Sequence, residues 1–224
     1  MIIDCISDLH GAHPKLEGGD LLIVAGDLTA RNRAEELTEF SLWLNIQQYK
    51  KIIVIAGNHD GLLEYSDHPR ILSEVNTSHV EYLCDTASAF EGLKVWGSPW
   101  TPTFCNWYFM KPRGEAIKKK WDLIPQDTDI LITHGPPWGI LDEVALSSRG
   151  DKYKHAGCEE LRMAVERVKP KLHVFGHIHN DGGKIDYLKH RDEWSPQKWA
   201  TICVNASIMN EAYEPVNKPI RVVL

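Results

Sequence analysis

The sequence predicts an α/β fold in which two β-sheets lie between outer layers of helices. Three observations support this prediction. Short runs rich in valine and isoleucine recur along the chain, stretches with helical periodicity lie between them, and the middle and the end of the chain add further β segments. Strands and helices that alternate in this way, together with additional strands, fit a sandwich of two central sheets with helices outside.

The inner strands are expected at five short apolar runs. These runs are nearly continuous in β-branched and other apolar residues, which is typical of strands covered on both faces. Together they should form the centre of both sheets: Ile2–Ile6, Leu21–Ala25, Ile52–Ala56, Ile130–Thr133 and Leu172–Phe175.

Three stretches between these runs predict helices. In the first, Leu37, Phe40 and Leu44 recur at helical spacing, and the last has the same kind of apolar stripe. The remaining stretch is rich in glutamate, alanine and lysine, which favour helix. The expected helices are Ala34–Gln47, Gly114–Trp121 and Glu160–Val168.

The β segments outside this alternation lie in the middle and at the end of the chain. Residues Ala89–Thr101 alternate apolar and polar side chains around Gly92 and Gly97, which predicts a hairpin in place of a strand–helix–strand unit. Late strands are expected at Trp199–Asn205 and Ile220–Val223.

Length and composition indicate a single globular domain over residues 1–224. With 224 residues and 43% hydrophobic content, the chain can bury one sizeable core. No apolar run reaches the roughly 20 residues that span a bilayer, so no membrane association is expected. The start of the chain has an acid at its fourth position and no basic region, which argues against a secretion signal.

The cysteines indicate the cellular compartment of the protein, and the net charge indicates which kinds of ligand it can bind. The five cysteines are an odd number without C-x-x-C spacing, which indicates reduced thiols and a cytoplasmic protein. A net charge of −6 argues against stable binding of duplex nucleic acid and fits a small anionic substrate better. The oligomeric state is not determined by these features.

Polar clusters follow several of the predicted strands. Strand ends are where ligand sites form in α/β sheets, and Gly or Pro marks a turn after each cluster. In the first cluster the side chains at i and i+2 should point to the same side of an extended strand end. Carboxylate, amide and imidazole donors without cysteine suit ions such as Mn, Fe, Ni or Zn. The clusters are Asp8-x-His10, Gly26-Asp27, Gly57-Asn58-His59-Asp60, Thr133-His134-Gly135 and Gly176-His177-x-His179.

This ordered set of motifs resembles the calcineurin-like metallophosphoesterase superfamily. Stretches such as Lys94–Pro102, Asp129–Pro137 and Lys169–His177 look like its small MPPED-type branch, which is similar to class III cyclic-nucleotide phosphodiesterases. The resemblance covers nearly the whole chain. It implies a four-layer α/β/β/α sandwich of two mixed sheets flanked by helices, and metal-dependent phosphodiesterase activity toward cyclic nucleotides.

The resemblance also implies two divalent metal ions and their ligands. Manganese is the expected ion, with iron, nickel, zinc or cobalt as alternatives. Asp27 would bridge the two ions, since one carboxylate can hold two cations close together. Some members of the branch have glycine at the position of His177 and are feeble catalysts, so the histidine here predicts a competent site. The first ion would be held by Asp8, His10, Asp27 and His179, and the second by Asp27, Asn58, His134 and His177.

The residues that follow Asn58 are the predicted catalytic ones. By resemblance His59 is not a ligand; it would face the substrate, stabilise charge on the phosphoryl oxygens and protonate the leaving alkoxide. Asp60 either orients His59 by accepting a hydrogen bond or closes the turn before Gly61. The nucleophile needs no side chain, because a hydroxide that bridges two cations can attack phosphorus.

Four functions remain open, and the first is favoured. It is hydrolysis of cyclic nucleotides or similar small phosphodiesters. A phosphatase acting on monoesters would be expected to have an arginine after its Gly-Asp motif, where this chain has Leu28-Thr29-Ala30. A nuclease could act only on short single-stranded ends, because the chain is too short for a DNA-binding addition. A non-catalytic scaffold would be expected to lose ligands, and none of the seven is lost.

Substrate contacts are predicted from weaker signals. Tryptophans near the presumed hairpin could stack a base, although tryptophan more often serves packing. Histidines outside the motifs, namely His13, His68, His79, His155, His173 and His190, are expected to have ordinary structural or surface roles. The substrate-binding candidates are Trp100, Asn106, Trp107, Arg113 and Asn180.

Overall fold

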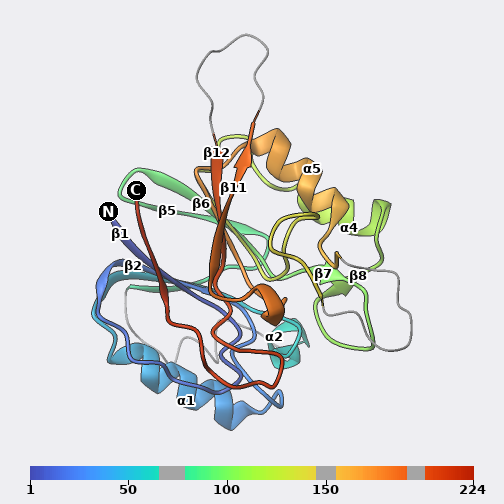
Figure 1. Cartoon of the computed structure of the whole chain (residues 1–224). Helices are drawn as coiled ribbons and strands as arrows, with labels where there is room; N and C mark the ends of the chain where they lie inside the picture. Colours follow the sequence, from blue (N-terminus) through green and yellow to red (C-terminus); the bar gives the residue numbers. More distant parts are fainter. Residues whose placement is uncertain (66–78, 145–154, 191–199) are drawn as a thin grey trace.

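The computed structural model describes residues 1–65, 79–144, 155–190 and 200–224, and two large sheets form its centre (Figure 1). The first sheet has five strands in the order β13-β1-β2-β3-β4. Strands β1 to β4 run parallel to one another, and β13 pairs with β1 in the antiparallel direction. In that order the strands are Ile220–Val223, Ile2–Ile6, Gly19–Ala25, Tyr49–Ile55 and Val80–Tyr82.

The second sheet has six strands in the order β11-β12-β10-β9-β6-β5. Its four inner strands are parallel, and the two edge strands β11 and β5 are antiparallel to their neighbours. In that order the strands are Lys184–Lys189, Ala200–Asn205, Leu172–Phe175, Ile130–Thr133, Leu93–Ser98 and Thr86–Phe90. The short strands β7 (Thr101–Pro102) and β8 (Met110–Lys111) form a separate pair.

The two sheets pack face to face, and helices cover their outer faces (Figure 1). Helix α1, Ala34–Asn45, lies on the first sheet, while α4, Glu115–Trp121, and α5, Glu159–Val168, lie together on the second. This arrangement confirms the four-layer sandwich of two mixed sheets. A short helix α2, Gly61–Tyr65, and a 3-10 turn η1, His179–Asp181, follow the strands β3 and β10.

The nearly continuous apolar runs are explained by burial on both faces of each sheet. In β2, Leu21, Ile23 and Ala25 belong to the core between the sheets, whereas Leu22 and Val24 belong to the core under the helices. All five side chains are fully buried. Each such strand contributes to two cores at once, so successive residues must all be apolar.

The helix predictions are confirmed with small shifts at their ends. Helix α1 ends at Asn45, two residues earlier than expected, and its start is held by the Glu36 carboxylate, which accepts hydrogen bonds from the backbone N–H groups of Arg31 and Arg33. Helix α5 begins one residue earlier than expected and ends before Lys169, which has a left-handed backbone with φ of 54°.

The predicted hairpin exists, but only one of its two glycines forms the turn. Strands β5 and β6 are joined at Glu91 and Gly92, both with positive φ. Gly97 instead lies inside β6, where an added Cβ would come within 2.5 Å of Leu83 Cβ and 2.8 Å of Ile55 Cγ2. The glycine is therefore needed for close packing, which alternation in the sequence does not reveal.

Four strands were not predicted, namely β4, β11 and the two-residue strands β7 and β8, and one prediction is only partly testable. Strand β4 has three half-buried residues, and β11 is an edge strand in which Leu188 is the one buried side chain, so neither shows a buried apolar run. The late strands are confirmed as β12 and β13, although Trp199 lies outside the described residues. No helix in the described ranges has the length and apolar character needed to cross a membrane.

Candidate metal centre

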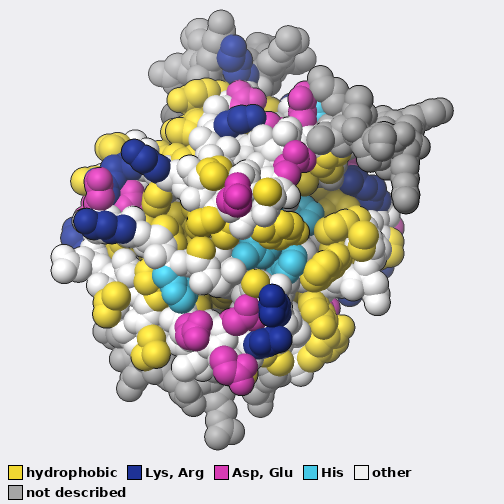
Figure 2. Space-filling model, turned by 60° about the horizontal axis from the view of Figure 1, so that its bottom comes forward, with side chains coloured by type: hydrophobic (Ala, Val, Ile, Leu, Met, Phe, Trp, Pro, Cys, Tyr) yellow, Lys and Arg dark blue, Asp and Glu magenta, His cyan; other side chains and the backbone are white. Residues whose placement is uncertain are grey.

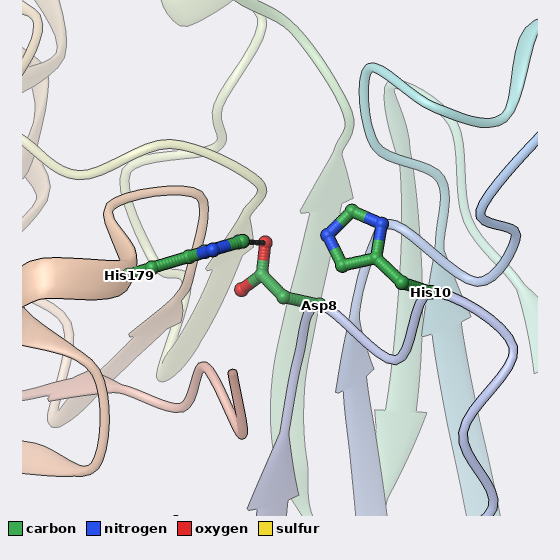
Figure 3. Close-up of side chains that lie close together, drawn as sticks. All are labelled: Asp8, His10 and His179. Atoms are coloured by element: carbon green, nitrogen blue, oxygen red, sulfur yellow. Dashed lines mark ion pairs between the residues drawn. The ribbon is translucent and has the colours of Figure 1, made fainter. Parts of the chain in front are cut away.

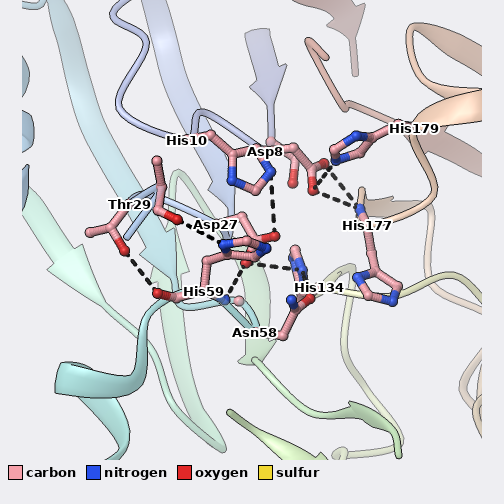
Figure 4. A network of polar contacts seen from close by, with 12 residues as sticks. Asp8, His10, Asp27, Thr29, Asn58, His59, His134, His177 and His179 are labelled. Carbon is pink, nitrogen blue, oxygen red and sulfur yellow. Dashed lines mark hydrogen bonds and ion pairs between the residues drawn. The ribbon is translucent and has the colours of Figure 1, made fainter. Parts of the chain in front are cut away.

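The predicted ligands come together where parallel strands of both sheets end. Asp8 and His10 follow β1, Asp27 follows β2, and Asn58 follows β3, all in the first sheet. The other three follow β9 and β10 in the second sheet and face them across the gap between the sheets (Figure 4). Parallel strands deliver their carboxyl ends to one edge, which explains why motifs far apart in sequence meet here.

The loops that hold these ligands turn sharply. Asp8, His10, Asp27 and His177 all have left-handed backbones, with φ between 43° and 68°. The expectation of an extended strand end at Asp8 and His10 is therefore wrong, although both side chains still reach the same place (Figure 3). Such φ values cost energy for residues other than glycine, and they gather at functional sites because side chains must be aimed there.

Motif glycines make room for the carboxylates. A Cβ at Gly57 would come within 2.3 Å of Asp27 Oδ1, and one at Gly176 within 2.2 Å of Asp8 Oδ2. The loops after β3 and β10 thus pass directly against the carboxylates of the loops after β2 and β1. Glycine is required at both positions for this close approach.

The two aspartates are buried and held by backbone donors. Asp8 accepts hydrogen bonds from the His177 backbone N–H at 3.1 and 3.0 Å, through its two oxygens. Asp27 Oδ1 accepts one from the His59 backbone N–H at 2.8 Å. Asp27 also lies 3.6 Å from His10 Nε2 and 3.4 Å from His134 Nε2, so it is at the centre of the cluster.

Two imidazoles are oriented by carbonyl groups behind them. His134 Nδ1 lies 2.9 Å from the Ala25 carbonyl oxygen, and His179 Nδ1 lies 3.1 Å from that of Asn210. An Nδ1–H that donates to a carbonyl fixes the ring and turns Nε2 toward the carboxylates. His134 Nε2 is also 3.0 Å from Asn58 Oδ1.

The electrostatics of the cluster favour a bound cation. Burial works against the charge of Asp8, but the hydrogen bond from His179 and the charges of the nearby histidines lower its pKa to about 2. The Asp27 pKa is also lowered, by His134 and His10 against burial. Burial opposes the charge of His134, yet Asp27 raises its pKa to about 9. The buried carboxylates therefore stay negatively charged and favour the protonated form of nearby histidines such as His134. A bound metal cation could supply the same positive charge in place of these protons.

The donor set fits divalent metals. Three overlapping groups have ligand atoms within 4.8 Å of one another: Asp8, His10 and His179; His10, Asp27 and His59; and Asp8, Asp27 and His134. Both ring nitrogens of His10 are buried without a hydrogen-bond partner among the described residues. A buried polar atom without a partner is costly, and a metal ion would satisfy one of these nitrogens.

His177 lies beside the cluster without joining any of these groups. Its ring packs edge-on against His134 with centroids 5.0 Å apart, and its backbone N–H binds Asp8. Burial, together with the charge of His134, lowers its pKa to about 3, which keeps the imidazole neutral as metal coordination requires. Its role as a ligand of the second ion stays a prediction.

His59 is held by other contacts than the one expected from Asp60. Its Nδ1 lies 3.1 Å from the Ala30 carbonyl oxygen, and its ring stacks on Trp107 at 4.3 Å. The fully buried Asp60 carboxylate instead accepts hydrogen bonds from the backbone N–H groups of residues 28, 29 and 57 and from the Thr29 hydroxyl group. Asp60 thus ties the loops after β2 and β3 together, as a turn-closing acid, and does not orient the His59 ring.

A pocket of about 770 Å³ opens over the cluster. Histidine side chains gather near the middle of the face in Figure 2, among hydrophobic side chains. Of the five substrate-binding candidates, Trp107, Arg113 and Asn180 line this pocket. Asn106 is exposed in the same loop as Trp107 but is not part of the lining.

Trp100 is a structural residue, contrary to the prediction. It is 8% exposed and does not line the pocket. Its Nε1 donates to Asp85 at 2.9 Å, and the Lys111 and Lys120 ammonium groups lie 4.5 and 4.3 Å from its ring centroid. The tryptophan therefore joins β6, β8 and α4, and its ring is not available for stacking a substrate.

Several pocket residues were not predicted. Tyr213 lies 4.9 Å from the His10 ring and 5.0 Å from the His179 ring, and no motif in the sequence points to it. Phe104 packs edge-on against His177 at 5.1 Å, and the aromatic residues around Trp107 could have indicated it. His155, assigned to an ordinary structural role, also lines the pocket. His68 lies outside the described residues.

The fold and the site together define a metallophosphoesterase. The sequence profile described as calcineurin-like phosphoesterase matches residues 1–181, and the chain belongs to this family of metal-dependent hydrolases of phosphoric esters. Within it, the chain is 38% identical over 239 residues to metallophosphoesterase domain-containing protein 1 of Homo sapiens, covering 96% of this chain and 68% of that protein. The expected MPPED-type branch is thereby confirmed.

A more distant relative is also known as a structure. The chain is 28% identical over 183 residues to the acyl-carrier-protein phosphodiesterase PptH of Mycobacterium tuberculosis, covering 73% of this chain and 53% of that protein. The crystal structure of phosphopantetheinyl hydrolase PptH from that organism superimposes with a TM-score of 0.58 at 16% identity, covering 99% of this chain and 95% of that chain. This second likeness concerns the fold alone.

Proposed function

We propose that this chain is a phosphodiesterase that uses two divalent ions, manganese first among them, to hydrolyse cyclic nucleotides or similar small phosphodiesters. The observation that carries the preference for diesters is the charge of the pocket lining. Arg113 is the one lysine or arginine among the described residues that line it. A monoester carries close to two negative charges and gains more from cationic side chains than a diester, which carries one.

Arg113 is already engaged by the protein. Its guanidinium donates to the carbonyl groups of Ala156 and Gly157 and pairs with the Glu159 carboxylate. Two further acids, Asp27 and Glu211, also line the pocket. The side chains thus offer little surplus positive charge to a dianion, and the bound ions would have to supply it.

The chain's own residues divide the work of hydrolysis. Asp8, His10, Asp27 and His179 would hold one ion, and Asn58, His134 and His177 would complete the second site with Asp27. When bound, the ions supply an activated water and neutralise charge on the phosphate oxygens. Asp60 keeps the loops after β2 and β3 at a fixed separation, because its carboxylate bonds to both.

His59 is placed to serve the leaving group. With Nδ1 bound to the Ala30 carbonyl and the ring stacked on Trp107, the side chain has one preferred orientation beside the carboxylates. In the imidazolium form, with the Nδ1–H donating to the Ala30 carbonyl, His59 would give its Nε2 proton to the departing alkoxide. In this proposal His59 protonates the leaving group, and the other residues bind the metal ions.

The size of the pocket and the thiols support the remaining parts of the proposal. A volume of about 770 Å³ lies in the range of pockets that bind whole small molecules, so it has room for a nucleotide. The name of PptH, a phosphodiesterase, also supports diester chemistry. All five cysteines are free thiols, which fits a reducing compartment, so we place the protein in the cytoplasm.

The test compares two substrates with the same leaving group. With manganese-loaded protein, bis-p-nitrophenyl phosphate should have a larger kcat/KM than p-nitrophenyl phosphate, and cyclic nucleotides should be hydrolysed as well. Asp27→Asn is the matched inactive control, since it keeps the size of the side chain and removes the charge. A kcat/KM for the monoester that is tenfold larger would instead establish a phosphatase.

A further inference from the structure

The pocket continues past the metal ligands to a wall that the motifs do not account for. Trp138, His155 and Arg113 line this wall, beside the metal-facing residues of the same cavity. The wall is formed by residues 138–144, which follow β9, by residues 155–159, which lead into α5, and by Arg113, which precedes α4. A substrate whose scissile phosphate lay at the metal ligands would place its remaining part against such residues.

Behind the wall lies a fully buried carboxylate, Asp142. It accepts hydrogen bonds from the Gly139 backbone N–H at 3.0 Å, the Gly157 backbone N–H at 2.9 Å and His155 Nδ1 at 2.8 Å. A Cβ at Gly157 would come within 2.7 Å of Asp142 Oδ2, so the two segments approach as closely as glycine allows. A buried carboxylate that is itself held by two backbone donors orients the imidazole that is its third.

The segment that carries Asp142 is itself fixed to the metal side of the pocket. Asn205 donates to the Leu141 carbonyl at 3.2 Å, and the Glu143 backbone N–H donates to Asp181 at 2.7 Å. Asn180, a predicted substrate contact, donates its side-chain amide to the Glu143 carbonyl at 3.1 Å. Because η1 carries both Asp181 and the metal-site residue His179, hydrogen bonds connect the wall to the metal side of the pocket.

This arrangement determines which edge of the His155 ring a ligand meets. Nδ1 faces Asp142, so Nε2 lies on the opposite edge, and the side chain is 32% exposed and lines the pocket. Among the described residues, Nε2 has no hydrogen-bond partner. The indole of Trp138 lies 5.3 Å from the same imidazole and gives the wall an apolar face. With Nδ1 carrying the proton, a neutral imidazole presents Nε2 as a hydrogen-bond acceptor.

The charges on this wall do not suit a second anionic group. The Arg113 guanidinium is already paired with the Glu159 carboxylate, and a neutral His155 imidazole adds no positive charge. A second phosphate would lack a surplus positive charge to bind. An uncharged hydroxyl group needs no positive charge and can donate a hydrogen bond to Nε2. The indole beside it can cover the carbon skeleton of a sugar-type alcohol.

We propose that His155, positioned by Asp142, is a specificity-determining residue that accepts a hydrogen bond from a hydroxyl group on the sugar-type alcohol part of the substrate, with Trp138 beside it. The inference rests on the proposed phosphodiesterase function and names the class of ester that it takes. Such esters release a ribose-like or polyol alcohol and not a plain aryl or alkyl one.

The test measures equilibrium binding, so that it does not depend on turnover. Calorimetry with manganese-loaded full-length chain compares adenosine 5′-monophosphate with its 2′,3′-dideoxy analogue, which lacks both ribose hydroxyls. The wild type should bind the dideoxy compound about 3- to 10-fold more weakly, the effect of one neutral hydrogen bond. In His155→Leu this ratio should fall to about 1, because the acceptor is gone.

Matched variants separate recognition from general damage to the wall. His155→Gln is the milder variant, and should also lose most of the preference, because the Asp142-bound geometry of the imidazole is lost. His13→Leu, at an exposed histidine that does not line this pocket, should keep the wild-type ratio. A purely structural role of His155 would weaken both nucleotides equally and leave the ratio unchanged, which would refute the inference.

Other results of the same experiments distinguish failure of the His155 proposal from failure of the proposed phosphodiesterase function. No hydroxyl preference in the wild type, or no binding of either nucleotide, would overturn the role of His155 even if the same preparation hydrolyses bis-p-nitrophenyl phosphate. A clear hydroxyl preference that depends on His155, in a preparation that hydrolyses no diester, would support the subsite and reject the phosphodiesterase function.

Discussion

Replacing His173 should make the protein less sensitive to acid. This histidine in β10 is fully buried, its Nε2 lies 2.8 Å from Thr133 Oγ1, and its Nδ1 has no hydrogen-bond partner among the described residues. The Thr133 hydroxyl donates to the Gly135 carbonyl, so Nε2 carries the proton and donates to Thr133. Burial lowers the pKa of His173 from its ordinary 6.5 to about 3.

The size of the effect follows from the two pKa values. Between pH 6.5 and about 3 the unfolded chain binds a proton at His173 and the folded chain does not, so stability falls as the pH falls through this range. Each pH unit costs about 1.4 kcal/mol. At pH 5, 1.5 units below the ordinary pKa, the loss from this one residue is about 2 kcal/mol, and it is absent above pH 7.5.

Urea unfolding at pH 7.5 and pH 5 can measure this loss. His173→Gln keeps a donor for Thr133 but cannot take up a proton, so its free energy of unfolding should fall by about 2 kcal/mol less than that of the wild type between the two pH values. Metal release at low pH affects both proteins and cancels in the difference. Parallel losses in the two proteins, within about 0.5 kcal/mol, would refute the argument from burial.

Three further predictions concern the site. Asp27→Asn should lower the metal content measured by atomic absorption and abolish hydrolysis, and chelation of the wild type should do the same until manganese is returned; activity that survives exhaustive chelation would contradict metal dependence. His59→Gln should lower kcat by about 10²–10⁴-fold with the metal content unchanged; a loss of metal would make His59 a ligand. His177→Gly should stay folded by circular dichroism and lose activity that high manganese partly restores; full kcat at trace metal would exclude His177 as a ligand.

The sequence was sufficient to predict the strands that carry the ligands. Runs such as Leu21–Ala25 are apolar at every position because each strand contributes to two cores, and this leaves a local signal. The polar motifs directly after these runs, including Asp27 and His134, could therefore be assigned to strand ends. Parallel pairing then brings such ends together, which is why the composition of the cluster was predictable.

Contacts between distant segments were not predictable in the same way. Asp60 was expected either to orient His59, its neighbour in sequence, or to close the turn, but its carboxylate also bonds to backbone groups 31 and 32 residues earlier, besides the start of its own turn. Trp100 was expected to face a substrate, but Asp85 and two lysines surround it. In both cases the three-dimensional neighbours, which no local pattern encodes, determine the role.

The sequence by itself thus determined the fold class and the chemical identity of the metal-binding groups. Both follow from periodicity and residue type within a few positions of each motif. Only the tertiary structure decided which groups beyond the motifs line the pocket. Tyr213 enters the pocket through a turn after β12 and meets the His10 ring, which follows β1 of the other sheet, so this contact depends on how the two sheets pack. His155 enters through the loop before α5 and is placed by Asp142, a residue 13 positions earlier that no motif marks.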